Sequence, residues 1–86
     1  MSDYHGWDSW ETWNAFNWMT EGDGAQERWA ARARGVEAEQ FAELLRLHFE
    51  SHVDRMHPEA SWFSDALYRS LGRVNWRQLA EHFTGD

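Results

Sequence analysis

Residues 37–56 read EAEQFAELLRLHFESHVDRM, and this stretch decides the fold class. Its apolar and aromatic side chains recur at steps of three and four residues, the spacing of one face of an α-helix. That face carries Phe41, Leu44, Leu45, His48, Phe49, His52, Val53 and Met56. Pro58 follows, and the residue before a proline avoids helical geometry. We therefore predict a long helix over residues 37–56 with one broad apolar face.

The flanking sequence predicts four shorter helices, because helix-favouring residues dominate and no alternating run of β-branched residues occurs. Their expected ranges are about 9–20, 25–34, 61–71 and 75–83. Glycine-containing turns separate several of them, as at residues 21–24. The chain shows neither a repeat nor a linker. We predict an all-α protein with a single helical domain over residues 1–86, a compact bundle of about five short helices with a tryptophan-rich core.

Local signals place the helix starts and the inward faces. Asp8 is expected to cap the first helix while Glu11 reaches back to it, and Asn75 with Gln78 is expected to start the last helix in the same way. In the fourth helix, the apolar positions predict an inward face that consists of Trp62, Phe63, Ala66, Leu67 and Leu71.

The composition indicates how so short a chain is stabilised. The 86 residues contain no cysteine, so disulfides are excluded. Seven tryptophans help to make 16% of the chain aromatic, and each buried ring removes about 150–250 Å² from water. We expect most rings near the first helix to join the core, with Trp10 or Trp18 the more exposed. The rings in question are Trp7, Trp10, Trp13, Phe16 and Trp18.

Charge and hydropathy restrict the location and the partners. The net charge is −7, which disfavours anionic lipid surfaces, and no stretch approaches the roughly 20 apolar residues that cross a bilayer. The first residues lack the basic start and apolar run of a secretory signal. We expect a cytosolic protein that does not bind membranes.

Both ends of the sequence carry short motifs that resemble those of a known family. Tyr4-His5-Gly6-Trp7, followed by Glu11-Thr12-Trp13-Asn14 and Trp18, is similar to a motif of small proteins encoded by phages, archaeal viruses and related mobile elements. The closing stretch from Val74 to His82, VNWRQLAEH, is similar to the end of those proteins. The resemblance covers about a third of the chain and brings no activity with it. It implies a viral context, and hence the host cytoplasm.

An acidic stripe on the long helix is the predicted contact face. It consists of Glu39, Glu43, Leu47, Glu50 and Asp54. The carboxylates repeat at steps of roughly 6 and 10 Å, close to two and three phosphate steps of one DNA strand. A solvated helix face has the same composition, and Arg46 interrupts the stripe. An apolar Leu47 within an acidic rim is typical of a surface that binds a protein. The acidic leading segment, residues 1–24, is the second choice.

Arginine rows offer a rival of a different class. All eight basic residues are arginines, and two rows of them fall on helical spacing. The rows are Arg28, Arg32 and Arg34, and Arg69, Arg73 and Arg77. A small regulatory nucleic-acid binder could use these rows with an exposed tryptophan. The net charge of −7 argues against this, and pairing with the chain's own carboxylates is the simpler use.

The remaining chemistry-bearing residues do not form a catalytic pattern. His48 and His52 share a helix face, as two metal ligands would, but a zinc protease needs Glu directly after the first histidine and Phe49 stands there. With His57 close by, a structural metal would still lack ligands, so we predict histidines at the core edge, without metal or cofactor. Neither a nucleophile motif nor a phosphate loop occurs, and we expect no enzyme.

Together these observations predict a small acidic accessory protein of viral type that acts by stoichiometric binding. Its partner would be a host or viral protein, and occlusion of a nucleic-acid-binding surface of a host defence system, by DNA mimicry or otherwise, would be one mechanism. A chain this short with so many aromatic residues is also expected to leave an apolar patch uncovered, which would suit a homodimer.

Overall fold

The computed structural model describes residues 4–56, 59 and 61–85, and five α-helices account for most of them. The helices are α1 (Trp10–Met19), α2 (Ala25–Ala33), α3 (Ala38–Met56), α4 (Trp62–Leu71) and α5 (Trp76–Thr84). In the described residues the only β-type pairing is an isolated bridge between Tyr4 and Trp7. The predicted all-α fold class is confirmed, and each expected helix lies within two residues of its predicted range.

The helix starts follow the capping residues, with one correction. Ser9, not Asp8, caps α1: its hydroxyl accepts a hydrogen bond from the Thr12 amide at 3.1 Å. Asp8 instead contacts the last helix: its backbone amide donates a hydrogen bond to the Gln78 side chain at 2.8 Å. The predicted cap at Asn75 is confirmed, because its side chain accepts from the Gln78 amide at the start of α5. At α4, Ser61 and Ser64 form a reciprocal capping box.

The turn between α1 and α2 depends on glycine. Gly22 and Gly24 both have positive φ angles, 93° and 75°, which side-chain-bearing residues seldom adopt. At Gly24 an added Cβ would also lie 3.2 Å from the Arg28 guanidinium. The turn predicted at residues 21–24 is therefore present, and Gly24 sets the direction in which α2 starts.

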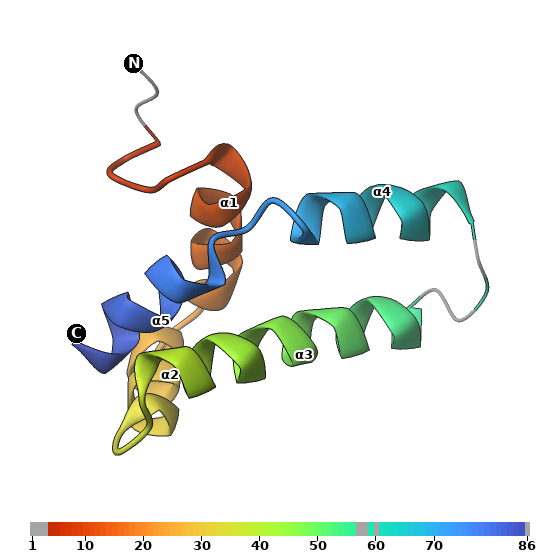
Figure 1. The fold of residues 1–86 in the computed structure, drawn as a ribbon. Helices are drawn as coiled ribbons and strands as arrows, with labels where there is room; N and C mark the ends of the chain where they lie inside the picture. Colours follow the sequence, from red (N-terminus) through yellow and green to blue (C-terminus); the bar gives the residue numbers. More distant parts are fainter. Residues whose placement is uncertain (1–3, 57–58, 60, 86) are drawn as a thin grey trace.

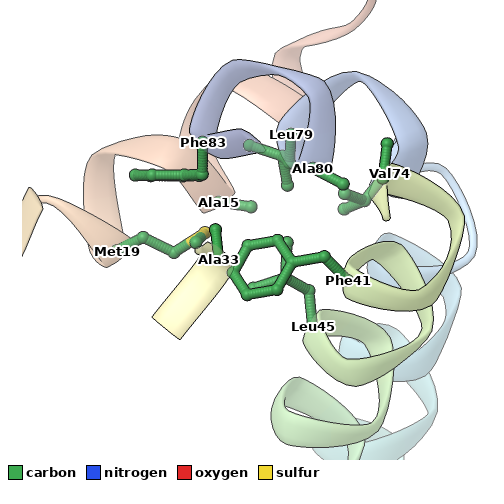
Figure 2. Close-up of a cluster of buried hydrophobic side chains, with 10 residues drawn as sticks. Ala15, Met19, Ala33, Phe41, Leu45, Val74, Leu79, Ala80 and Phe83 are labelled. Carbon is green, nitrogen blue, oxygen red and sulfur yellow. The ribbon is translucent and has the colours of Figure 1, made fainter. Parts of the chain in front are cut away.

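The core lies where α3 and α5 cross, with α1 and α2 closing its sides. Figure 2 shows Phe41 and Leu45 of α3 directed toward Leu79 and Ala80 of α5. The other hydrophobic members of the core come from α1, α2, α3 and α5 and from the turn before α5; they are Ala15, Met19, Ala33, Ala38, Phe83 and, in the turn, Val74. Small alanines allow the helices to approach closely. Burying these side chains is the main contribution to the stability of the fold.

The aromatic cluster surrounds this core. Trp7, Trp29 and Trp76 are half-buried and pack against it, as do Phe16 and Phe49. Trp10 and Trp18 are the more exposed rings of α1, as predicted, with 47% and 66% of their surface accessible. Three of the tryptophans therefore cover the core from outside, while Phe41, Leu45 and Leu79 fill its centre.

α3 and α4 extend away from this core as an antiparallel hairpin (Figure 1). The first half of α3 lies against α5 and α2, whereas its second half has α4 beside it. The predicted inward face of α4 is wrong except at Leu71, which is partly buried; the exposed members are Trp62, Phe63, Ala66 and Leu67. α4 turns Ser64 inward, and Tyr68 reaches back to α3. α3 is the main partner of α4, so most of the α4 surface is left uncovered.

Candidate protein-binding groove

Exposed apolar side chains concentrate on the hairpin. Seven of the nine large hydrophobic residues that are exposed in the described structure belong to α3 or α4. They are Leu44, Leu47, Met56, Trp62, Phe63, Leu67 and Tyr68. The other two are Trp10 and Trp18 of α1. Such a concentration on one part of a small domain is typical of an interaction surface.

An apolar groove runs between α1 and the second half of α3. It consists of two adjoining hollows of 230 and 380 Å³ that share Trp18, Phe49 and His52. One hollow continues to Val53, Met56, Leu67 and Leu71, and the other to Met19, Trp29 and His48. The stretch of α3 from His48 to Met56 spans about 12 Å at about 1.5 Å per residue, or roughly two helical turns. The groove is therefore long enough for a short helix.

The groove exists because α1 does not cover the second half of α3 completely. α4 lies along the side of α3 that carries Glu50 and Asp54, as the contacts of the Tyr68 hydroxyl show. The side that carries Phe49, His52 and Met56 lines the open hollow, whose other walls are α1 and the second half of α4. Trp18 belongs to the last turn of α1 and is two-thirds exposed there. An apolar floor with an accessible indole beside it can bury a partner's side chain.

Cationic groups border the end of the groove near Trp29. The Arg32 guanidinium lies over the Trp29 ring, 4.7 Å from its centroid, in a cation–π contact. The His48 ring meets the same indole edge to face at 5.1 Å. Burial lowers the pKa of His48, and the positive charges of Arg32, His52 and Arg55 lower it further. The charges that act on His48 are thus all cationic, so this end of the groove favours an acidic group.

The residues of the two terminal motifs form a clasp between the ends of the chain. The Thr12 hydroxyl accepts from the Asn75 amide at 2.8 Å, although Thr12 is fully buried. The Gln78 side chain accepts from the Asp8 amide at 2.8 Å and donates to the Gly6 carbonyl at 3.2 Å. The motif residues Gly6, Thr12, Asn75 and Gln78 therefore have a structural role, which the sequence alone did not reveal.

A hollow of 440 Å³ adjoins this clasp and is lined by His5, Gly6, Trp7, Phe16, Gln78, Glu81 and His82. Its rings pack on one another: Trp7 lies 4.7 Å from Phe16 and 5.5 Å from His82, centroid to centroid. Of its polar side chains, Gln78 is held in the clasp, and Glu81 accepts from Arg77 at 3.1 Å. The lining side chains therefore contact one another, and nothing in their arrangement indicates a ligand.

The acidic stripe of α3 lies on the side of the helix that includes Leu47, and much of its charge has internal partners. Arg46 binds Glu43 at 2.5 Å and Glu50 at 2.8 Å, and the contact lowers the pKa of Glu43. The Tyr68 hydroxyl donates to Asp54. Glu39 and Leu47 are exposed. The internal pairs interrupt the regular row of free carboxylates that a DNA mimic would present.

The arginine rows are mostly engaged. In the second row, Arg73 lies 3.7 Å from Glu11, and Arg77 binds Glu81 at 3.1 Å. In the first row, Arg28 donates to the Asp23 carbonyl and Arg32 stacks on Trp29, whereas Arg34 ends α2. The interpretation that arginines pair with the chain's own carboxylates is confirmed for Arg46, Arg73 and Arg77.

The two histidines of α3 line the groove. His48 contacts Trp29 and Phe49, and His52 is shared by both hollows. Across the described residues, no group of three or more histidine or acidic side chains is arranged to hold a metal ion. His57 lies outside the described residues. In the same part of the chain, no helix has the length and apolarity that crossing a membrane requires.

Sequence reasoning missed the groove because it assigned its residues to the core. Met56 belongs to the predicted apolar face of α3, yet 63% of it is exposed, because it lies at the end of the helix and lines the open hollow. One signal was available for α4: Trp62, Ala66 and Arg69 share a helix face, and an arginine on it indicates an outward face. Comparisons of the chain with protein-family models, with curated proteins and with solved structures find no match.

Proposed function

We propose that this protein acts by binding another protein stoichiometrically and that the groove between α1 and α3 is the contact surface. One observation carries the proposal: the groove has an apolar floor two helical turns long, beside which Trp18 remains 66% exposed. Burying a tryptophan in a preformed apolar groove is a common source of interface affinity. The acidic stripe has one exposed apolar centre, Leu47, so it is the weaker candidate.

The shape and charge of the groove define the kind of partner. Two turns of apolar floor suit one face of an amphipathic helix, whose anchors recur at three and four residues. Arg32, over the Trp29 ring, is placed to attract a carboxylate at that end, and the charge of Arg55 also acts on His48, whereas Glu11 lies at the other end within 3.7 Å of Arg73. The preferred partner is therefore a short helix with apolar anchors and an acidic flank.

The resemblance of both termini to proteins of phages and archaeal viruses supports a narrower form of the proposal. In that setting the partner is a host or viral protein, and occupying its exposed helix would prevent that helix from binding elsewhere. Inhibition of a host defence component is one such outcome. The binding mode would be the same for any host or viral partner.

A displayed library of helical peptides provides the test, because it samples many candidate partner helices at once. We expect selected peptides to share apolar residues at helical spacing with acidic flanks. Trp18→Ala should weaken their binding about tenfold or more, as expected for a central aromatic anchor. Trp10→Ala is the matched control, since Trp10 is another exposed tryptophan of α1 and lies outside the groove. Added salt should weaken binding through Arg32 and Arg55.

Two further experiments separate the groove from its rivals. The double charge reversal Glu43→Lys with Glu50→Lys should leave peptide binding intact; if it abolishes binding while Trp18→Ala does not, the acidic stripe is the contact surface instead. Gel-shift titration with DNA and RNA addresses the arginine rows. Tight nucleic-acid binding that is lost on Arg28→Glu or Arg69→Glu would overturn the proposal in favour of a regulatory nucleic-acid binder.

A further inference from the structure

The side of α4 that faces away from α3 carries an exposed aromatic residue with two opposite charges. We call it the outer α4 face; it consists of Trp62, Asp65, Ala66 and Arg69, which line a hollow of 370 Å³. Trp62 has 75% of its surface exposed, the largest fraction among the exposed large hydrophobic residues of the described structure. None of these four residues lines the groove. This face is therefore separate from the proposed binding site.

The two charges on this face are not used within the described part of the chain. Asp65 and Arg69 are four residues apart, a spacing at which an acid and an arginine on a helix often pair. In the described residues, nevertheless, neither takes part in an ion pair, and the four pairs present use other side chains. One negative and one positive group thus remain available on a face with no net charge.

We infer that the outer α4 face binds the same face of a second copy of this chain, with the two α4 helices antiparallel about a two-fold axis near Ala66. A symmetric dimer requires that a surface be complementary to itself. At about 1.5 Å per residue, Trp62 lies about 6 Å before Ala66 along the helix and Arg69 about 4.5 Å after it. Reversing the second helix therefore places Trp62 beside Arg69 of the second copy.

The same reversal brings each Asp65 within reach of Arg69 of the second copy, about 3 Å away along the axis. Each copy thus contributes a cation–π contact and an ion pair, and symmetry doubles both. Ala66 at the crossing point lets the helix axes approach to about 8–10 Å. The charges cancel locally, so the repulsion expected from a net charge of −7 on each chain is reduced at the contact.

The size of the face sets the expected affinity. Each Trp62 buries at most about 150–250 Å², and Phe63, also exposed, extends the apolar area at the edge of the face. One helix face per copy falls at the low end of specific interfaces, which bury about 1,200 Å² in total or less when they are transient. The dimer should therefore be weak, with a dissociation constant in the micromolar range or above, and it leaves the groove open in both copies.

Analytical ultracentrifugation over micromolar to millimolar concentrations of the full chain tests the inference. The wild type should show a reversible monomer–dimer equilibrium. Asp65→Arg and Arg69→Asp should each raise the dissociation constant about tenfold or more, because each replaces two attractions with two repulsions. An equimolar mixture of D65R and R69D chains should form heterodimers more readily than either variant forms homodimers, since opposite charges then meet across the contact.

Two controls make the outcome decisive. Trp62→Ala should weaken the dimer without changing the helical circular dichroism signal, because the ring is exposed. Peptide binding in the groove should be the same in R69D as in the wild type, so failure of the dimer and failure of the groove proposal are distinguishable. A wild type that stays monomeric at millimolar concentration, or a dimer that neither charge variant weakens, would overturn the inference.

Discussion

Helices α4 and α5 are nearly equal in length, each begins with a tryptophan after a polar cap, and they differ in almost everything else. α5 (Trp76–Thr84) buries Leu79, Ala80 and Phe83, whereas α4 (Trp62–Leu71) buries only Ser64. The difference follows from their neighbours, because α5 packs against α3, α2 and α1, while α3 is the main partner of α4. This arrangement divides the molecule into two regions. The closed region around α5 stabilises the fold, and the open hairpin of α3 and α4 presents apolar surface.

The largest contrast between these regions should appear when one leucine is truncated in each. Leu79→Ala removes a fully buried side chain of α5 and should cost about 2–5 kcal/mol of unfolding free energy, a large fraction of the total for a small domain. Leu67→Ala alters an exposed leucine of α4 and should change it by less than about 1 kcal/mol. Urea denaturation of both variants measures the difference. Equal costs would show that the hairpin is part of the core.

The sequence predicts the helices of both regions but the burial of only one. In α5, Leu79 and Phe83 share a face and that face is buried. In α4 the same reasoning assigned Trp62 and Phe63 to the core, because helical periodicity identifies an apolar face and not the neighbours that cover it. Capping was predictable where one side chain offered the bond, as at Asn75. It failed at Asp8, whose hydrogen bonds go to residues about seventy positions away.

The candidate site was predictable to a smaller extent. The exposure of Trp10 and Trp18 followed from their place apart from the main apolar side of α1. The groove beside Trp18 depends on how far α3 extends past α1, which is a tertiary quantity that no local pattern contains. The acidic stripe was visible in the sequence, but its internal pairs depend on the side-chain geometry of Arg46 and Tyr68.

A second experiment tests how the closed region is held together. Thr12→Val keeps the shape of a fully buried side chain but removes the hydroxyl that the Asn75 amide and Ser9 contact at 2.8 Å. The Asn75 amide would then lack its partner, so we expect a loss of about 1–3 kcal/mol in unfolding free energy. Thr12→Ser retains the hydroxyl and should cost less. If T12V is tolerated while T12S is harmful, packing of the methyl group and not the clasp is what matters.

The smallest expected effect concerns the hydrogen bond that joins α4 to α3 within the open hairpin. The Tyr68 hydroxyl of α4 donates to Asp54 of α3 and lies 3.4 Å from the Glu50 carbonyl oxygen. The hydrogen bond to Asp54 is the main cause that raises the pKa of Tyr68 to about 12, with lesser contributions from burial and from the charges of Asp54 and Glu50. Titrating the absorbance of tyrosinate measures this pKa, and Tyr4→Phe leaves Tyr68 as the only tyrosine.

Asp54→Asn should return the pKa of Tyr68 toward its ordinary value of 10.0, because the carboxylate that disfavours the phenolate is gone. The sign for stability follows from linkage. The folded chain holds this proton more tightly than the unfolded chain, so the contribution of Tyr68 is complete below pH 10.0 and is lost as the pH rises toward about 12. The difference in melting temperature between the wild type and Tyr68→Phe should therefore shrink across that interval. Since the pair is exposed to solvent, the effect should be small, and a difference as large as that of Leu79→Ala would mean that α4 is closed onto α3 as firmly as α5 is.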